Sequence, residues 1–264
     1  ATRAEDAKTL VDAAAQSGVP LLVGHHRRHN PLIQRAKQLI DDGEIGEVRA
    51  VQATCWFYKP DAYFEAADWR RRQGAGPVSV NLVHDVDLIR YLCGEVLAVH
   101  AMSHPSARGY ETEDVAGAVL NFEHGAIGVL SVSDSIVSPW SWELTSREYP
   151  IYPPTPESCY QIGGSHGALS IPDLRVWRHA DGGRDWWSPI SAMSVPRDAT
   201  DPLVNQIENF AAVIRGEAAP LVSGETGWRT LQVIEAIQRS AETGLRVDLD
   251  AGGRGHGQDA AENI

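Results

Sequence analysis

The sequence lacks the features that mark membrane-spanning, secreted or disulfide-linked proteins. No apolar run reaches the roughly 18 residues of a transmembrane helix, so we expect no membrane partner. The first residues also lack the apolar core of a signal peptide. The three cysteines, Cys55, Cys93 and Cys159, lie far apart and form no Cys-x-x-Cys pair. This pattern argues against a disulfide framework or a zinc site and indicates a cytoplasmic protein.

Positive charge is also scarce in this chain. There are 23 Lys and Arg residues against 35 Asp and Glu residues, which gives a net charge of −12. A surface this acidic repels phosphate backbones, so we expect no nucleic-acid partner. Hydrophobic residues make up 43% and charged residues 22% of the 264 positions, which is typical of a folded globular protein.

Residues 1–46 alternate between helix, strand and helix. A helix that ends at Gly18 precedes the apolar run at 19–24, which is typical of a strand buried on both faces. A second helix, which ends near Gly43, has its apolar residues on one face. This order is that of a parallel α/β sheet, but a single strand cannot form one. We therefore expect residues 1–46 to be the C-terminal remnant of an α/β domain, in a sequence cut from a longer chain.

Short strands dominate residues 47–250. Apolar alternation and Gly-rich turns predict strands at 48–58, 96–102, 115–122, 126–133, 142–146, 160–163, 169–171, 175–179 and 186–190. Since few helices separate them, we predict an open antiparallel β-sheet domain with flanking helices. Two helices close this domain, at 202–214 and 226–243. The first has an apolar stripe that we expect to be buried, formed by Leu203, Ile207, Phe210 and Ile214. Residues 251–264 are predicted to be a disordered tail.

One predicted helix, between residues 74 and 94, has polar groups on an otherwise apolar segment. Asn81, His84 and Asp87 recur every three residues and share one face, and Asp85 lies four residues after Asn81. Buried polar groups without partners cost about 1–3 kcal/mol each, so these groups require partners or a cavity. Because histidine exchanges protons near neutral pH, His84 is a candidate acid–base group. The alternative is a histidine that caps a loop or bonds a backbone carbonyl.

Four segments are specific when their order and spacing are taken together. They are Gly-Val-Pro-Leu-Leu-Val-Gly-His-His-Arg-Arg-His-Asn-Pro at 18–31, Gly-Glu-Ile-Gly-Glu-Val at 43–48, Trp-Arg at 69–70, and Asn-Leu-Val-His-Asp-Val-Asp-Leu at 81–88, shortly after a Gly-Ala-Gly turn. Their order resembles that of the Gfo/Idh/MocA oxidoreductases, the family of glucose–fructose oxidoreductase and inositol dehydrogenase. The resemblance runs in register from Ala1 to about Leu249.

This resemblance implies a Rossmann domain for NAD or NADP, followed by an open-sheet domain. It implies that residues 1–46 are the C-terminal remnant of the dinucleotide-binding domain, and that residues 47–250 form the substrate and oligomerisation domain. The substrate lies between the two domains, and a hydride passes between its C–OH group and the nicotinamide. His84 matches the family histidine that takes the hydroxyl proton as the hydride leaves.

Other residues are expected to contact the substrate. Arg27 matches a position where family members often contact substrate, and a surface salt bridge is the alternative for it. We expect Asn81, Asp85 and Asp87 to form a polar group of substrate contacts. Trp69 and Arg71, on the loop before the helix, are expected to wall the pocket, with simple packing as the alternative.

The sequence departs from the family pattern in two ways. No Gly-x-Gly-x-x-Gly turn follows an early strand, and the Glu-Lys-Pro motif with its catalytic lysine is missing. We therefore expect this chain alone to bind no dinucleotide tightly and to be inactive, and its cofactor-binding residues are unknown. Second, Val80 replaces an aspartate that many members carry four residues before the histidine. Either Asp85 or Asp87 then orients His84, or His84 acts with the missing lysine, or the proton chemistry differs.

Two further clusters were considered. The segment Ser-Pro-Trp-Ser-Trp-Glu at 138–143 makes Trp140 a candidate substrate contact or pocket wall, and a subunit interface is the alternative. His25, His26 and His29 suggest metal ligands, but adjacent side chains on an extended strand point to opposite faces. We therefore expect no metal site.

These observations predict that the full-length protein is an NAD(P)-dependent oxidoreductase acting on a sugar, polyol or related hydroxy compound. The alternative is a non-catalytic assembly module or a sugar-binding module that needs no cofactor. An uncovered apolar sheet face favours association, so we expect a homodimer or homotetramer formed through the open sheet.

Overall fold

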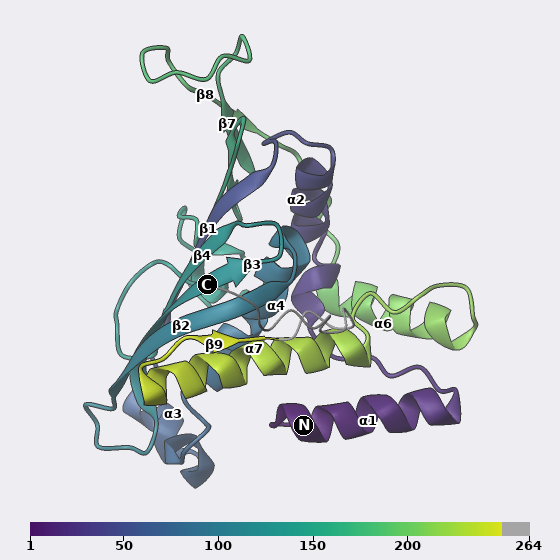
Figure 1. The fold of residues 1–264 in the computed structure, drawn as a ribbon, viewed down its shortest axis with the longest axis vertical. Coiled ribbons are helices and arrows are strands. Elements are labelled where there is room, and N and C mark those ends of the chain that lie inside the picture. Colours follow the sequence, from purple (N-terminus) through teal and green to yellow (C-terminus); the bar gives the residue numbers. More distant parts are fainter. Residues whose placement is uncertain (250–264) are drawn as a thin grey trace, which may run out of the picture.

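A computed structural model describes residues 1–249, which form one nine-stranded sheet with helices packed against it (Figure 1). The helices are α1 (Ala4–Ser17), η1 (His26–His29), α2 (Pro31–Asp41), α3 (Asp61–Glu65), η2 (Asp68–Arg71), η3 (Val78–Leu82), α4 (Val83–Cys93), α5 (Trp142–Thr145), α6 (Pro202–Ile214) and α7 (Gly224–Thr243). The strands are β1 (Val48–Trp56), β2 (Val96–Pro105), β3 (Glu113–Phe122), β4 (Ile127–Ser133), β5 (Tyr160–Gly164), β6 (Ala168–Ile171), β7 (Arg175–Arg178), β8 (Ser191–Ser194) and β9 (Val247–Asp248).

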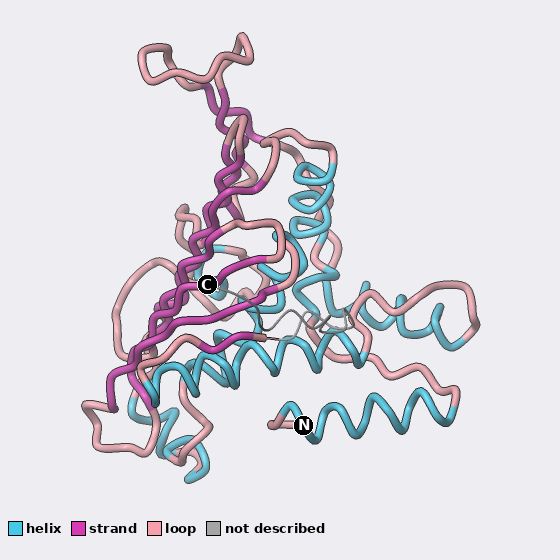
Figure 2. The backbone as a smooth tube through the Cα atoms, in the orientation of Figure 1, coloured by secondary structure: helices cyan, strands magenta, loops and turns pink. Residues whose placement is uncertain are grey.

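The strands lie in the order β8-β7-β6-β5-β1-β4-β3-β2-β9. Every neighbouring pair is antiparallel except the central pair, β1 and β4, which is parallel. The predicted open antiparallel sheet with flanking helices is therefore confirmed, with one parallel pair that the strand pattern did not predict. Figure 2 shows these strands as one continuous twisted layer.

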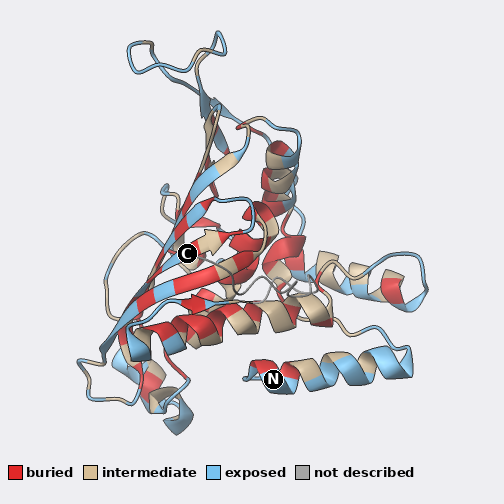
Figure 3. Ribbon diagram, in the orientation of Figure 1, coloured by how far each residue is buried: buried red, intermediate tan, exposed pale blue. Residues whose placement is uncertain are grey.

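One face of the sheet is covered by helices α2, α4 and α7 (Figure 1). Inward-facing residues of β1, such as Val51, Ala53 and Cys55, are buried in the same apolar cluster as Val233 and Ile237 of α7. Figure 3 shows the resulting alternation of buried and exposed positions along the strands. Removing this apolar surface from water is the main force that holds the helices against the sheet.

Residues 1–46 pack against the rest of the chain through α1, which contacts α7, and α2, which contacts α4. The expected strand at 19–24 is wrong for this structure. Only an isolated bridge between Leu22 and Ser223 forms there, because no further strand lies beside it in the part of the chain described. The division at residue 46 stays a prediction, and the tail predicted for 251–264 falls outside the described residues.

The buried stripe predicted on α6 is also wrong. Leu203, Ile207, Phe210 and Ile214 are 44%, 61%, 45% and 66% exposed. Helix α6 contacts η1 and projects from the body of the molecule (Figure 1), and much of its apolar face is left exposed. A helical stripe shows which face is apolar, but the neighbouring elements decide whether that face is covered.

Two predicted strands have other structures. Residues 142–145 form α5, because Ser141 caps the helix by accepting a hydrogen bond from the Leu144 amide. Residues 186–190 lie in a loop before β8, where Trp186 and Trp187 are 85% and 84% exposed. No helix among residues 1–249 combines the length and apolar character needed to cross a bilayer.

Candidate active site

A widened helical turn begins the segment that carries His84. Residues Val78–Leu82 form a π-helix that continues directly into α4. Glu113 holds its start, because the Glu113 Oε1 atom accepts a hydrogen bond from the Val78 amide at 2.9 Å. A side chain at Gly76 would collide with this carboxylate, at 2.3 Å from its Oε2 atom. Such π turns occur often at functional sites, and this one directly precedes His84.

The His84 ring lies between two other imidazoles. Its centroid is 5.6 Å from that of His25 and 6.1 Å from that of His26, both in edge-on geometry. Its Nδ1 atom is buried and has no hydrogen-bond partner among the described residues. Burial, followed by the charge of Arg27 and the two neighbouring histidines, lowers the pKa of His84 to about 2. The imidazole is therefore neutral at physiological pH, and its unprotonated nitrogen is able to accept a hydrogen bond.

Arg27 is a buried charge that two carboxylates share. Its guanidinium donates to Asp85 Oδ1 at 3.0 Å and to Glu143 Oε1 at 2.9 Å, and it lies 5.4 Å from the centroid of the Trp142 ring. Burial alone would lower the pKa of Arg27, but Asp85 and Glu143 outweigh it and raise that pKa. The surface salt bridge considered for Arg27 is wrong, because the residue is only 3% exposed.

Two acidic groups around one arginine leave a surplus of negative charge. Burial raises the pKa of Asp85 to about 6; Arg27 opposes this rise and Glu143 adds to it. The Tyr160 hydroxyl also donates a hydrogen bond to Asp85. Asp85 is thus held by Arg27 and Tyr160, and it makes no hydrogen bond with His84 among the contacts of the described residues.

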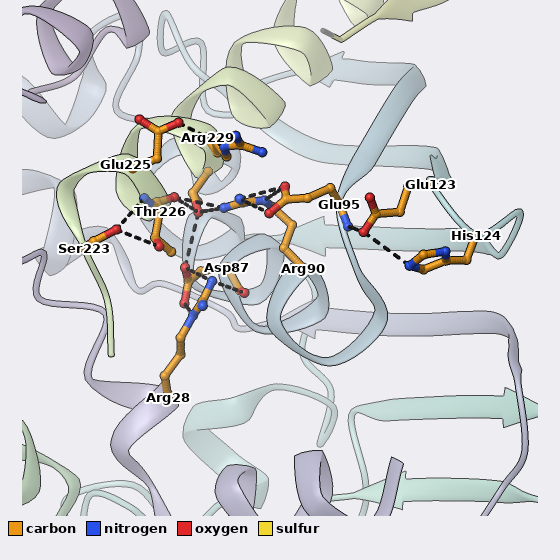
Figure 4. A network of polar contacts seen from close by, with 11 residues as sticks. Arg28, Asp87, Arg90, Glu95, Glu123, His124, Ser223, Glu225, Thr226 and Arg229 are labelled. Atoms are coloured by element: carbon orange, nitrogen blue, oxygen red, sulfur yellow. Dashed lines mark hydrogen bonds and ion pairs between the residues drawn. The ribbon is translucent and has the colours of Figure 1, made fainter. Parts of the chain in front are cut away.

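Asp87 belongs to a second buried ion pair, shown in Figure 4. Arg28 donates to both of its carboxylate oxygens at 2.8 Å and to its backbone carbonyl at 3.1 Å. Thr230 of α7 donates to the same carboxylate at 3.2 Å and also accepts from Arg90 at 2.6 Å. These bonds tie η1, α4 and α7 together. Val80 stands where many family members have an aspartate that could orient His84. Neither Asp85 nor Asp87 takes over that role here, because other residues hold both carboxylates.

His26 forms a dyad with a buried glutamate. Its Nε2 atom lies 2.6 Å from Glu148 Oε1, and Glu148 Oε2 accepts from Asn30 and from the Trp142 indole, each at 3.0 Å. Burial alone would raise the pKa of Glu148, but the hydrogen bond to His26 and the other donors outweigh it and lower that pKa. Glu148 therefore stays charged and fixes the orientation of the His26 ring.

The expectation that His25 and His26 point to opposite faces is wrong. It assumed an extended strand, whereas the 3-10 helix that begins at His26 turns the chain and brings both rings against His84. Within residues 1–249, no group of three or more His, Cys, Asp or Glu side chains is arranged to hold a metal ion.

Several buried polar atoms in this region have no hydrogen-bond partner within the described residues. They are His25 Nδ1, His84 Nδ1, Asp85 Oδ2 and Glu143 Oε2, together with Asn81 Oδ1, which lies three positions before His84 in the same helical segment. Each such atom costs about 1–3 kcal/mol when it is removed from water without a partner. A concentration of them at one place indicates a site that a polar ligand completes.

The structure brings together only part of the predicted site. Arg27, Asn81, His84 and Asp85 belong to this cluster. The other candidates have different neighbours: Trp69 lies against Arg70, the Arg71 side chain donates to the Phe64 carbonyl and lies over Tyr110, and Trp140 packs on Trp56 and donates to Glu157. Trp69 is also 55% exposed. None of these contacts joins Trp69, Arg71 or Trp140 to His84.

Sequence reasoning missed several members of the cluster. Glu143 lies in the segment flagged for Trp140, but the pairing of Glu143 with Arg27 spans 116 positions and left no local pattern. His26 and Glu148 are separated by 122 positions. The consecutive histidines at 25 and 26 were the one local signal for this cluster. They were not assigned to the site because an extended strand was expected there.

Comparison with known proteins agrees with this arrangement. A profile of the GFO/IDH/MocA C-terminal domain matches residues 33–170, which is more than half of the chain. The chain belongs to the GFO/IDH/MocA family. The resemblance noted in the sequence is therefore confirmed.

Relatives within the family include named dehydrogenases. The chain is 29% identical over 250 residues to the D-apiose dehydrogenase of Paraburkholderia graminis, a match that covers 92% of this chain and 63% of that protein. It is 26% identical over 253 residues to the inositol 2-dehydrogenase of Rhizobium meliloti, covering 93% of this chain and 70% of the relative. The chain thus spans less than two thirds of the first of these enzymes.

Solved structures of the family share the fold. The WlbA dehydrogenase from Bordetella pertussis, in complex with NADH and UDP-GlcNAcA, superposes with a TM-score of 0.72 at 28% identity. This match covers 95% of the present chain and 69% of WlbA.

Proposed function

We propose that the protein is an NAD(P)-dependent dehydrogenase that transfers a hydride between a nicotinamide and a hydroxyl-bearing carbon of a sugar, polyol or related compound. The observation that carries this proposal is the cluster of buried polar atoms without partners around His84. Hydroxyl groups of a polyol both donate and accept, so they would satisfy Asn81 Oδ1, Asp85 Oδ2 and Glu143 Oε2 together. D-Apiose and inositol, the compounds named for two relatives, are ligands of this kind.

Within this proposal, His84 holds the reacting hydroxyl group and takes its proton. Its neutral imidazole is suited to accept a hydrogen bond from the hydroxyl, and Arg27 orients the acidic oxygens that bind neighbouring hydroxyls. Since the low pKa of His84 disfavours a charged imidazolium, the proton would not stay on the ring. Asp87 is assigned a positioning role, because Arg28 and Thr230 already occupy its oxygens.

The residues of this chain do not fit the phosphates of a dinucleotide. The 264 residues contain no Gly-x-Gly-x-x-Gly turn. Accordingly, no cofactor-binding residue is assigned and no step is derived through the nicotinamide. The residues of this chain are assigned to the substrate side of the reaction.

The test is an oxidation assay of the natural gene product that carries these residues. NAD⁺ and NADP⁺ are each supplied with D-apiose, myo-inositol, scyllo-inositol and simple aldoses, and reduced nicotinamide is followed by absorbance. We expect turnover with at least one polyol or sugar, and a loss of at least about 100-fold in kcat in His84→Asn, as for removal of a general base. His124→Asn is the matched control, because the His124 side chain is 77% exposed. Absence of turnover on the whole panel, or an active His84→Asn enzyme, would contradict the proposal.

We also propose that the protein is a homo-oligomer through the open face of the sheet. Register aligns one row across this face, and its six positions from β2 to β6 hold no Asp, Glu, Lys or Arg: His100, Val119, Val129, Gln52, Gln161 and Ser170. The next position in register, in β7, is Arg175. In a chain with a net charge of −12, an uncharged row of this length supports burial against a second copy.

The oligomer proposal is tested by light scattering. Val129 lies within this row, so Val129→Lys should shift a dimer or tetramer towards monomer. The control Val137→Lys places the same charge at a residue that is 83% exposed and outside this row. A parent protein that is monomeric at tens of micromolar would contradict the proposal. A cytoplasmic location is a further proposal, supported by the three free, buried cysteines.

A further inference from the structure

One proton of the proposed reaction has no resting place on His84. Burial, followed by nearby positive charge, lowers the pKa of His84 to about 2, so the ring does not keep the proton that it takes from the substrate hydroxyl. Two nearby groups are also unsuited to hold it. Burial lowers the pKa of His25 as well, and Asp85 is already held by hydrogen bonds from Arg27 and Tyr160.

His26, the other imidazole beside His84, is bonded to a carboxylate. The two ring centroids are 6.1 Å apart, which is near enough for one hydroxyl group or water molecule to bridge the rings. His26 Nε2 lies 2.6 Å from Glu148 Oε1. Because a charged carboxylate only accepts hydrogen bonds, the proton of the neutral His26 ring lies on Nε2. His26 Nδ1 is then the nitrogen that is free to take a second proton.

Glu148 is fixed in this position from two further sides. Its Oε2 atom accepts hydrogen bonds from Asn30 and from the Trp142 indole, each at 3.0 Å, and its side chain is only 2% exposed. The preceding residue, Arg147, has a φ angle of 60°, in the left-handed region that non-glycine residues avoid. Backbone strain of this kind concentrates at functional sites, and here it directly precedes the carboxylate that holds His26.

We infer that His26 and Glu148 form a proton relay, which takes the proton of the substrate hydroxyl from His84 and passes it to water. The relay rests on the proposed function, because it begins at the reacting hydroxyl group. The hydroxyl O–H bond breaks as an N–H bond forms on His84. His84 then gives a proton to His26 Nδ1, and the His26 side chain, which is 14% exposed, releases a proton to water.

Glu148 acts on this relay through its charge and exchanges no proton. Its carboxylate stabilises the His26 imidazolium while the second proton is on the ring, as the buried carboxylate of a catalytic triad does. It also fixes which nitrogen of His26 faces away from it. His26 and Glu148 are therefore positioning residues that act through His84, and neither is assigned a contact with the substrate.

The relay is tested in the natural gene product by steady-state oxidation of the substrate found in the assay above. We expect kcat to fall at least about tenfold in both His26→Asn and Glu148→Gln, with KM for the substrate within about twofold of the parent. Added imidazole should restore part of kcat in His26→Asn, because a free imidazole carries the same proton. A residue that only supports the fold would show no such recovery.

The matched controls are His124→Asn and Glu123→Gln. These residues also form a histidine–carboxylate pair, at 3.4 Å, but their side chains are 77% and 37% exposed. We expect both controls to stay within about twofold of the parent in kcat and to be insensitive to imidazole.

A second measurement needs no turnover. In protein labelled with nitrogen-15 at histidine, the His26 signals are assigned from their loss in His26→Asn. We expect the neutral ring to carry its proton on Nε2. A neutral His26 ring protonated on Nδ1 would overturn the relay, because no free nitrogen would then face away from Glu148.

Two kinetic results would also overturn it. The first is a kcat of His26→Asn within about threefold of the parent while His84→Asn is inactive, which would leave the proposed function in place. The second is an increase in KM without recovery by imidazole, which would assign the pair to the fold. Absence of turnover in the parent would refute the proposed function and the relay together.

Discussion

The buried pair of Arg28 and Asp87 provides the clearest test of how this site is held. The two side chains are 8% and 1% exposed, and three hydrogen bonds of 2.8 to 3.1 Å join Arg28 to Asp87. Arg28→Met keeps most of the side-chain volume but leaves a buried carboxylate with the Thr230 hydroxyl as its remaining donor. Breaking one partner of such a pair costs about 3–5 kcal/mol, because the other charge stays buried.

For a chain of this size, that loss corresponds to a decrease in Tm of roughly 6 to 20 °C. Urea denaturation of the parent, Arg28→Met, Asp87→Asn and the double variant measures the coupling between the two residues. We expect the double variant to be at least about 2 kcal/mol more stable than the sum of the single losses predicts, because it removes the unpaired charge.

The control is Arg49→Met, in a pair with Glu47 whose side chains are 67% and 77% exposed, and we expect no measurable change there. A loss below about 1 kcal/mol in Arg28→Met, or strict additivity in the double variant, would refute the reasoning.

Three other predictions follow from the geometry. Acidification from pH 7 to pH 5 should destabilise the parent by up to about 2 kcal/mol more than it destabilises His84→Gln. The reason is that the unfolded imidazole binds a proton near pH 6.5, whereas the folded one, with a pKa of about 2, does not. Equal loss of stability in urea titrations of the two proteins would contradict this. Glu143→Gln removes a negative charge and should bring the pKa of Asp85 down from about 6, as measured by carbon-13 NMR. An unchanged pKa of Asp85 would contradict the idea that Asp85 and Glu143 share the charge of Arg27. Gly164→Ala should cost about 1–3 kcal/mol, since its Cβ would lie 2.1 Å from a backbone oxygen, whereas Gly163→Ala meets only a contact at 3.9 Å; similar thermal melts for both variants would refute this.

Parts of the site were predictable because their signals are local. The spacing of His84, Asn81 and Asp85 on one helix is a property of adjacent positions, and the order of short segments carried the family resemblance. Arg27 was found through that resemblance, but its burial was not, since its partners Asp85 and Glu143 lie 58 and 116 positions away. Trp69 and Arg71 were proposed from nearness in the chain and Trp140 from its aromatic segment, and their contacts lie elsewhere.

The sequence by itself determined the alternation of apolar residues that makes each strand two-faced, the ends of the main helices and the membership in a family. Those features depend on neighbours within one turn or one strand. Only the tertiary structure decided that β1 and β4 run parallel, that the apolar stripe of α6 is exposed, and that His25 and His26 meet at His84. The physical reason is that pairing, coverage and burial depend on contacts between distant segments, which no local pattern records.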